Sequence, residues 1–446
     1  MKFNPVFAAV CLSVLSGCSA TQLTETKQTD SPAVASFLPK APIGYQWQLI
    51  ENMSDEFNGD SLNQDKWLNY IPTWRGRPPA KFLKENVTVN NGNLELKTST
   101  YSGEDKEDFT MGGAAVSGKY GQTFGYFESR VKASKTKLST TFWLHSDKAE
   151  NPKGDCENRH SIEIDILEAI GGWPQAWWAN MMHSNTHYKP SALKDGKCRG
   201  ADYLSKGVKY DTKRKLSDDF NTYAAWWVTP NQVHYYYNGI LTGTVNLTHE
   251  KDPVAFNGDM SLRMVAETYT WQQKLIKNIP GNHLPYPTAA ELNDASINTA
   301  YYDHVRSYQL VPMADNLLVN PDFEDANLAW QFASGATISA AAKHSYTQGK
   351  GLRVQGKATA QQTVKVNTNS HYRLTGYSRN QEVNAGGKIV VKDQQQNIIA
   401  TSLINTTEFK LSRIEFNTAN NSQITVEIQG SRGNVSLVDN LALIKM

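Results

Sequence analysis

The segment His160-Ser-Ile-Glu163-Ile-Asp165-Ile-Leu-Glu168-Ala169 sets three acids among apolar, β-branched residues. Because side chains two apart on a strand share a face, Glu163 and Asp165 point one way and the neighbouring isoleucines point the other. Glu168 lies at an odd offset from Glu163, so a regular strand would turn it into the core, where an unpaired carboxylate is costly. One extra residue in a β-bulge returns it to the face of the other two acids. The sequence therefore predicts a bulged strand with three carboxylates in a row on one face.

Short alternating segments separated by turn residues surround this strand, from about Tyr45 to Pro312. One of them runs into Asn238-Gly239, the strongest short signal for a β-hairpin. Long amphipathic helical patterns are scarce, so the many short strands predict a β-sandwich or barrel. Longer polar stretches interrupt the alternation and are expected to be loops that build a binding site, at residues 71–85, 145–160, 188–219 and 272–297.

A second unit of alternating segments begins near Asp315. It opens with Asn320-Pro-Asp-Phe-Glu324, ends near Asp439-Asn440, and contains a single tryptophan and no cysteine. A small, separate β-sandwich is the natural interpretation. The predicted fold class is therefore all-β, with a larger sandwich over residues 41–313 and a smaller one over residues 314–446.

The N-terminus predicts export. Lys2 is followed by an apolar run over residues 6–15, which is too short to span a membrane and is typical of a signal peptide. The sequence Leu15-Ser-Gly-Cys18 resembles a bacterial lipobox, which predicts a lipoprotein signal peptide over residues 1–17 and lipidation of Cys18; an ordinary secretory signal is the alternative. Ser19 suits the outer membrane. We expect residues 18–40 to be a flexible tether, with the protein lipid-anchored in the cell envelope and facing the exterior.

Composition excludes some classes of protein. With 39% hydrophobic and 20% charged residues among 446, the chain is not intrinsically disordered. The net charge of +2 gives no reason to expect a nucleic-acid partner. The 10% of aromatic residues suits either a carbohydrate-binding protein or a β-rich core. In an exported chain, Cys156 and Cys198 are expected to form a disulfide, and no cysteine and histidine spacing suggests zinc.

Three acids placed close together suggest a catalytic site. Like charges resist simultaneous ionisation, so at least one pKa must rise. A close pair of carboxyls is the arrangement of a retaining glycosidase, in which one acts as nucleophile and the other as acid and base. The middle acid can share a proton with the nucleophile. A calcium site or a salt-bridged edge strand is the alternative, although the run is too apolar for a typical calcium loop.

The motif Glu163-x-Asp165-x-x-Glu168 resembles that of glycoside hydrolase family 16, and the surrounding residues 45–312 are similar to its marine red-algal galactanases: agarases, porphyranases and carrageenases. Supporting segments are Ser54-Asp-Glu-Phe-Asn58, Trp74-Arg-Gly-Arg-Pro-Pro79, Thr141-Phe-Trp-Leu144, Glu267-Thr-Tyr-Thr-Trp271 and Tyr302-Asp-His-Val-Arg306, although His304 stands where an aromatic residue is more usual. The resemblance implies a β-jelly-roll with an open concave cleft and endo-cleavage with retention, without a catalytic cofactor. It makes Glu163 the nucleophile, Asp165 the assisting acid and Glu168 the acid/base.

Several residues are candidates for sugar contact. Arg75 and Arg77 flank Gly76, and a guanidinium pairs well with an ester sulfate. His183 and His187 alternate along a predicted strand and could instead be solvated, and a third ligand for a metal is not evident. Each tryptophan could instead belong to the core. The predicted substrate-binding set is Trp74, Arg75, Arg77, Trp143, Trp173, His183, Asn185, His187, Glu267 and Trp271.

The C-terminal unit resembles carbohydrate-binding modules that begin with an Asn-Pro-x-Phe-Glu pattern. Such modules often hold one structural calcium, for which Glu324 and Asp439 are the matching acids; the unit could equally be a spacer. The resulting hypothesis is a monomeric endo-hydrolase of β-1,4 linkages in a red-algal galactan of the agar or porphyran class, with a sulfated chain as a candidate substrate. Alternatives are a hydrolase of furcellaran or carrageenan, a transglycosylase, and a non-catalytic surface protein that binds glycan.

Overall fold

The computed structural model describes residues 35–146, 160–200, 204–247, 256–341, 343–382 and 386–446. The predicted signal peptide, the lipidation site Cys18, Cys156 and most of the expected 145–160 loop lie outside these ranges, so the anchor and the Cys156–Cys198 disulfide stay predictions. In the described ranges, no helix has both the length and the apolar character needed to cross a bilayer.

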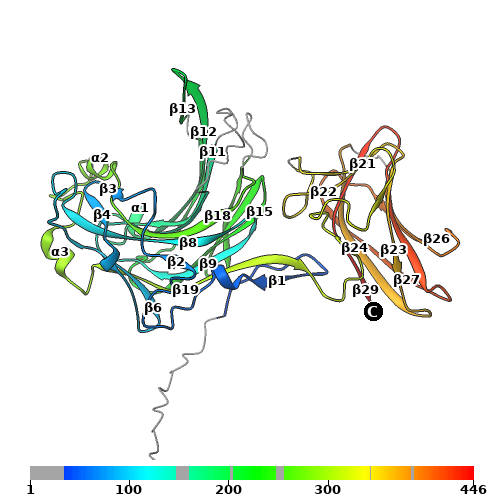
Figure 1. The fold of residues 1–446 in the computed structure, drawn as a ribbon, viewed down its shortest axis with the longest axis horizontal. Coiled ribbons are helices and arrows are strands. Elements are labelled where there is room, and N and C mark those ends of the chain that lie inside the picture. The colour runs from blue at the N-terminus through cyan, green and yellow to red at the C-terminus, as the bar shows by residue number, and fades with distance from the viewer. Residues whose placement is uncertain (1–34, 147–159, 201–203, 248–255, 342, 383–385) are drawn as a thin grey trace, which may run out of the picture. The chain divides into compact units, whose positions relative to one another are not determined.

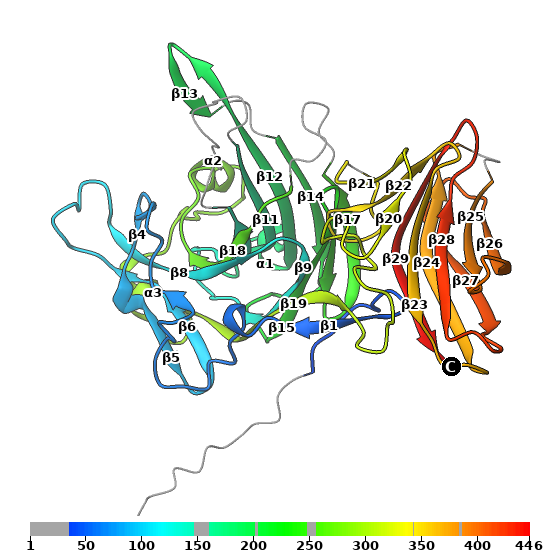
Figure 2. The ribbon, with the colours of Figure 1, turned by 45° about the vertical axis from the view of Figure 1, so that its right-hand side comes forward.

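Two curved sheets form the first sandwich (Figures 1 and 2). One has the order β17-β16-β15-β9-β19-β6-β5, with β1 beside β19. Its strands are β1 (Tyr45–Leu49), β5 (Val87–Asn90), β6 (Asn93–Lys97), β9 (Gly125–Lys132), β15 (Asn221–Thr229), β16 (Gln232–Tyr237), β17 (Ile240–Asn246) and β19 (Thr299–Pro312).

The other sheet, here called the cleft sheet, has the order β13-β12-β11-β10-β18-β8-β4-β3, with β14 beside β12 and both β2 and β7 beside β8. Its strands are β2 (Trp67–Leu68), β3 (Gly76–Arg77), β4 (Ala80–Phe82), β7 (Ser99–Thr100), β8 (Met111–Gln122), β10 (Thr140–His145), β11 (His160–Ala169), β12 (Met181–Lys194), β13 (Lys197–Gly200), β14 (Leu204–Asp211) and β18 (Met260–Ala266). A core between the two sheets unites Ile162 and Ile164 of β11 with Trp227 and Tyr235 of the opposite sheet.

Local sequence accounts for the hairpin and for the short helices. Asn238 and Gly239 adopt φ angles of 46° and 77°, as a two-residue turn between β16 and β17 requires, so the hairpin prediction is confirmed. The helices are short: 3-10 turns at Glu51–Met53 and Lys84–Asn86, and α1 (Ala176–Ala179), α2 (Gln272–Ile276) and α3 (Ala289–Asn293). Thr288 and Glu291 form a capping box that begins α3.

The expectation of a loop over residues 188–219 is wrong for most of that range. β12 continues to Lys194, and β14 returns beside it, with Lys209 opposite His183 and Ser205 opposite His187. The many polar residues reflect the position of β14 at the edge of the sheet, where much of the strand is exposed to solvent. The cleft sheet is therefore wider than the sequence suggested.

Two five-stranded sheets follow, with the orders β20-β23-β28-β25-β26 and β21-β22-β29-β24-β27. A separate core that includes Phe323, Trp330 and Tyr372 lies between them. This confirms the expected second all-β unit, while the exact boundaries 41–313 and 314–446 stay predictions. The strands are β20 (Gln331–Phe332), β21 (Ala336–Ser339), β22 (Gly351–Gln355), β23 (Thr359–Lys365), β24 (His371–Asn380), β25 (Gly387–Lys392), β26 (Ile398–Ile404), β27 (Lys410–Asn417), β28 (Gln423–Gln429) and β29 (Val435–Lys445).

Candidate active site

The predicted bulge is present in β11. On the β10 side, Trp143 pairs with Asp165 and Phe142 pairs with Leu167, which leaves Ile166 as the extra residue. The pairing with β12 shifts at the same place, between Asp165 and Glu168. Ile166 and Leu167 are both fully buried in the core although they are consecutive. The bulge therefore turns Glu168 to the same face as the two acids before it.

This face forms the floor of an open cleft of about 630 Å³. The cleft is lined by all three acids and by side chains from neighbouring strands and loops, namely Thr73, Trp74, Arg77, Thr141, Trp143, His145, Trp178, Asn185, His187, Lys189, Ser205, Arg263, Glu267, Tyr269 and Trp271. Seven of the ten predicted sugar-contact residues are in this set.

β12 supplies a partner for each acid in a diagonal pattern. Glu163 lies opposite His187 in the register, but its Oε2 is 2.6 Å from Nζ of Lys189, two residues further along. Asp165 lies opposite Asn185, and its Oδ2 is 2.9 Å from Nε2 of His187. Each carboxylate thus contacts the residue next to its direct partner on the same face of β12.

Glu168 follows the same pattern and gains a second donor. Its Oε2 accepts a hydrogen bond of 2.5 Å from Nδ2 of Asn185, and its Oε1 accepts one of 3.0 Å from the hydroxyl of Tyr269. His183, which is opposite Glu168 in the register, is left beyond the end of the row.

The three carboxyls have different pKa values because their neighbours differ. Burial favours the neutral form of Glu163, but the ammonium of Lys189 and the nearby His187 outweigh burial and lower its pKa. Burial and the two neighbouring carboxylates raise the pKa of Asp165 well above its ordinary value. Burial also raises the pKa of Glu168, against the opposing effect of its two hydrogen bonds. The surroundings therefore favour the ionised form of Glu163 and the protonated form of Asp165.

Nε2 of His187 lies 2.9 Å from Oδ2 of Asp165, but the two groups do not form an ion pair at neutral pH. Burial lowers the pKa of His187 to about 4, so the imidazole is uncharged there, and the raised pKa of Asp165 favours its neutral form as well. Glu163, Asp165 and His187 are close enough together to hold a metal ion, but the Lys189 ammonium, 2.6 Å from Glu163, opposes a cation there.

A second acid faces the cleft beside Arg77. Oε2 of Glu267 is 3.3 Å from Nε of Arg77. Burial raises the pKa of this carboxyl to about 8, although the positive charge of Arg77 acts to lower it. The Arg77 guanidinium lies over the rings of Trp74 and Tyr269, at 5.6 and 5.2 Å from their centroids. Arg77 is therefore held in one orientation at the cleft wall.

Three predicted contact residues lie outside the cleft lining. Arg75 is 65% exposed and pairs with Asp105 and Asp108, because the positive φ of Gly76 sends the two flanking arginines in different directions. Trp173 is buried in a cluster beneath the cleft and packs edge-on against Trp271, 6.2 Å away.

His183 is the third of these corrections. It is buried, stacks on Trp178 at 3.8 Å and bonds through Nε2 to the carbonyl of Trp177 at 2.7 Å. The turn of α1 places Trp178 over the start of β12, so Trp178 lines the cleft and His183 supports it from behind.

Sequence reasoning missed several lining residues. Lys189 continues the alternation of Asn185 and His187 by one more step, and His145 likewise follows Trp143, so extending the strand pattern would have found both. Tyr269 lies between Glu267 and Trp271 at the same spacing. Arg263 had no local signal, because only the pairing of β18 with β10 brings it opposite Trp143.

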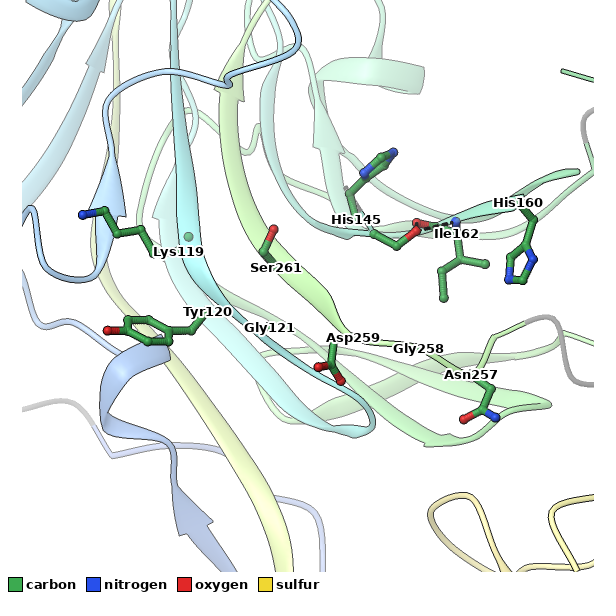
Figure 3. Close-up of a pocket in the computed structure, with 12 residues that line it drawn as sticks. Lys119, Tyr120, Gly121, His145, His160, Ile162, Asn257, Gly258, Asp259 and Ser261 are labelled. Carbon is green, nitrogen blue, oxygen red and sulfur yellow. Dashed lines mark hydrogen bonds between the residues drawn. The ribbon is translucent and has the colours of Figure 1, made fainter. Parts of the chain in front are cut away.

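A second hollow of about 290 Å³ adjoins the cleft and shares His145 with it. Figure 3 shows this hollow between the ends of several strands of the cleft sheet, with Lys119 and Tyr120 from β8 and His160 from β11. The hollow therefore meets the cleft at His145.

The two acids predicted to bind calcium lie in the C-terminal unit and contact backbone amides. Glu324 Oε1 accepts hydrogen bonds from the N–H groups of Gly349 and Lys350, at 3.0 and 2.8 Å. Asp439 is fully buried and accepts from the N–H groups of Tyr346 and Thr347. Burial raises the pKa of Glu324 to about 7 and that of Asp439 well above normal, which a bound cation would relieve. Among the described residues no third acidic or histidine ligand joins them, so a calcium ion there would depend on carbonyl oxygens.

Comparison with known proteins agrees with this geometry. The profile described as "Beta-porphyranase A-D, GH16 domain" matches residues 47–310. Beta-porphyranase B of Phocaeicola plebeius is 36% identical over 300 residues, which cover 62% of this chain and 89% of that protein. Beta-porphyranase D of Zobellia galactanivorans is 37% identical over 300 residues, which cover 62% of this chain and 64% of that protein. The crystal structure of the beta-porphyranase BpGH16B from Bacteroides plebeius superposes with a TM-score of 0.53 at 35% identity, covering 62% of this chain and 96% of that one. The chain belongs to glycoside hydrolase family 16, in the group of the beta-porphyranases and their agarase relatives.

Proposed function

We propose that this protein is a retaining endo-hydrolase that cleaves β-1,4 linkages within a red-algal galactan of the agar or porphyran class. The observation that carries the proposal is the row of three carboxyls on one face of the cleft, in which Glu163 lies 2.6 Å from the Lys189 ammonium and Glu168 accepts from Asn185 and Tyr269. Lys189 lowers the pKa of Glu163 and favours its ionised form, while burial raises the pKa of Glu168 and favours its protonated form. These are the states that a nucleophile and a general acid need before the reaction begins.

The proposed reaction has two displacements. In the first, a carboxylate oxygen of Glu163 attacks the anomeric carbon while Glu168 gives its proton to the departing glycosidic oxygen, which leaves a covalent glycosyl-enzyme. In the second, the Glu168 carboxylate takes a proton from water as that water attacks the same carbon and releases Glu163. Asp165, protonated beside the nucleophile, donates a hydrogen bond that stabilises the Glu163 carboxylate when it departs.

A sulfated galactan is the favoured substrate because of Arg77. Its guanidinium is fixed by two aromatic rings at the cleft wall, which suits recognition of a sulfate ester. The similar proteins named beta-porphyranase support porphyran as the first substrate to test. Furcellaran and carrageenan are the next candidates.

The decisive experiment is incubation of the purified protein with porphyran, agarose, furcellaran and carrageenan, followed by product sizing and proton NMR of the newly formed anomeric centre. We expect mid-size oligosaccharides from porphyran whose new reducing end first appears with the β-configuration. A first product of inverted configuration would reject Glu163 as nucleophile. Binding of all four polymers without cleavage would favour the non-catalytic alternative.

Three further properties belong to the proposal. We propose that Cys18 carries the lipid that anchors the enzyme to the outer membrane, that the protein acts as a monomer, and that Glu324 and Asp439 hold a structural calcium ion in a sugar-binding C-terminal module. Radiolabelled palmitate should label the wild-type protein and not Cys18→Ala. Light scattering should give a monomer, and calcium should raise the Tm of the protein treated with chelator.

A further inference from the structure

The cleft floor extends onto the edge strand β14. Its register with β12 places Ser205 opposite His187, Gly207 opposite Asn185 and Lys209 opposite His183. Because directly opposed residues share a face, these three belong to the face that carries the catalytic row. Ser205 is indeed part of the cleft lining.

Gly207 leaves this part of the cleft floor without a side chain. A Cβ atom at this position would lie 2.1 Å from Oδ1 of Asn185, whose amide holds Glu168. Any side chain here would displace Asn185. Between Ser205 and Lys209, the strand therefore presents only backbone to a molecule that lies across the sheet.

Trp177 lies at the end of this path. Its side chain is 46% exposed, more than that of any other tryptophan among the described residues. The ammonium of Lys209 is 4.5 Å from the centroid of its ring, and His183 packs edge-on at 5.3 Å while bonding to its carbonyl. The indole is thus fixed in place but largely open to solvent.

A row of stacked rings connects Trp177 to the acid/base. His183 stacks on Trp178 at 3.8 Å, Trp178 on Trp271 at 4.7 Å, and Trp271 on Tyr269 at 4.8 Å. The hydroxyl of Tyr269 donates to Glu168. Trp178, Trp271 and Tyr269 of this row line the cleft, and His183 behind them contacts the Trp177 of the Trp177–Lys209 pair.

We propose that Trp177 and Lys209 form an outer subsite that binds a sulfated sugar unit of the galactan beyond the units at the scissile bond. The inference rests on the proposed function. An exposed indole offers a flat apolar surface to the C–H face of a pyranose, and an exposed ammonium pairs with an ester sulfate as a point charge.

The test compares long and short substrates. Trp177→Ala and Lys209→Met are each expected to lower kcat/KM about tenfold on a long sulfated oligosaccharide. Neither change should affect the shortest oligosaccharide that the wild-type enzyme cleaves. Trp177→Phe should recover part of the loss in kcat/KM. Added salt should lower kcat/KM on the long sulfated oligosaccharide more for the wild-type enzyme than for Lys209→Met.

Lys206→Met is the matched control, because Lys206 is on the same strand but opposite Thr186, on the other face, where its ammonium bonds to the carbonyl of Asn246. It should leave both substrates unchanged. An equal loss on long and short substrates, or no loss on either, would overturn the subsite.

Binding in an inactive background separates this inference from the proposed function. Calorimetry on Glu163→Gln, with and without Trp177→Ala, measures the affinity for a long sulfated oligosaccharide whether or not the wild-type enzyme cleaves it. Tenfold weaker binding without Trp177 supports the subsite, and equal binding rejects it. Failure of the wild-type protein to cleave any galactan would reject the proposed function alone.

Discussion

Two of the places where the protein buries carboxylates, the cleft and the segment around Glu324 and Asp439, surround these groups differently. In the cleft, Glu163 and Glu168 are held by side chains of β12, an ammonium and an amide. In the C-terminal sandwich, Glu324 and Asp439 accept hydrogen bonds from backbone N–H groups of the segment 346–350. Burial acts to raise the pKa in both places, but of Glu163, Glu168, Glu324 and Asp439 only Glu163 has a lowered pKa, because the Lys189 ammonium lies 2.6 Å from its carboxylate.

The different hydrogen-bond partners suit the first group of acids to catalysis and the second group to stabilising the fold. Side-chain partners differ in charge from one position to the next, so neighbouring acids can hold different protonation states in an open cleft. Backbone amides are alike at every position, and they tie a loop to a carboxylate. We therefore expect substitutions in the first region to change catalysis and substitutions in the second to change stability.

The largest effect should come from the catalytic pair. Glu163→Gln should lower kcat by about 10⁴-fold or more, and Glu168→Gln by about 10²–10⁴-fold, since each removes a group that acts on the reacting bond. Thermal unfolding of both variants should match the wild-type protein within a few degrees. Turnover close to wild type in either variant would remove that residue from the mechanism.

Next in size is loss of a backbone-held acid. Asp439→Asn should lower the free energy of unfolding of the C-terminal sandwich by about 1–3 kcal/mol, because the new amide N–H cannot accept from the backbone donors. Activity on short soluble oligosaccharides should not change. Glu415→Gln, which changes an exposed acid of the same unit, is the control and should not change the Tm. A loss of kcat in Asp439→Asn would contradict the division proposed above.

Lys189→Met should change the pH dependence of the reaction. The proposed mechanism needs Glu163 ionised and Glu168 protonated, so activity should fall below the pKa of the first and above the pKa of the second. Removing the ammonium raises the pKa of Glu163, so the acid limb of the kcat/KM profile should move to higher pH. Lys189→Arg should restore the profile, and the exposed Lys194→Met should not move it. An unchanged acid limb would show that Lys189 does not control the nucleophile.

The smallest predicted effect concerns substrate choice. Arg77→Met should lower kcat/KM on sulfated oligosaccharides about tenfold relative to neutral ones, through loss of one charge-assisted contact. Arg75→Met is the matched control, since Arg75 points to Asp105 and Asp108. Equal losses of kcat/KM on sulfated and neutral chains would mean that Arg77 holds the cleft wall in place and does not bind sulfate.

Much of the active site could be predicted from local sequence. Alternation placed Glu163 and Asp165 on one face, and the cost of burying Glu168 required the bulge, which the register shows at Ile166. The same logic failed for Arg75 because a glycine with positive φ separates it from Arg77. It failed for His183 because the diagonal pairing of the two strands ends at Asn185, where Glu168, the last acid of the row, is bound.

The all-β class, the hairpin at Asn238-Gly239 and the shared face of the three acids follow from local sequence, because strand alternation and turn chemistry act between residues close in the chain. The charged partners of each acid and the extent of the cleft depend instead on the packing of distant segments. Lys189 reaches Glu163, Tyr269 reaches Glu168, and Lys209 reaches Trp177 through strand pairing and loop packing over long sequence separations. Electrostatic and stacking contacts depend on distance in space, which the order of residues along the chain does not specify.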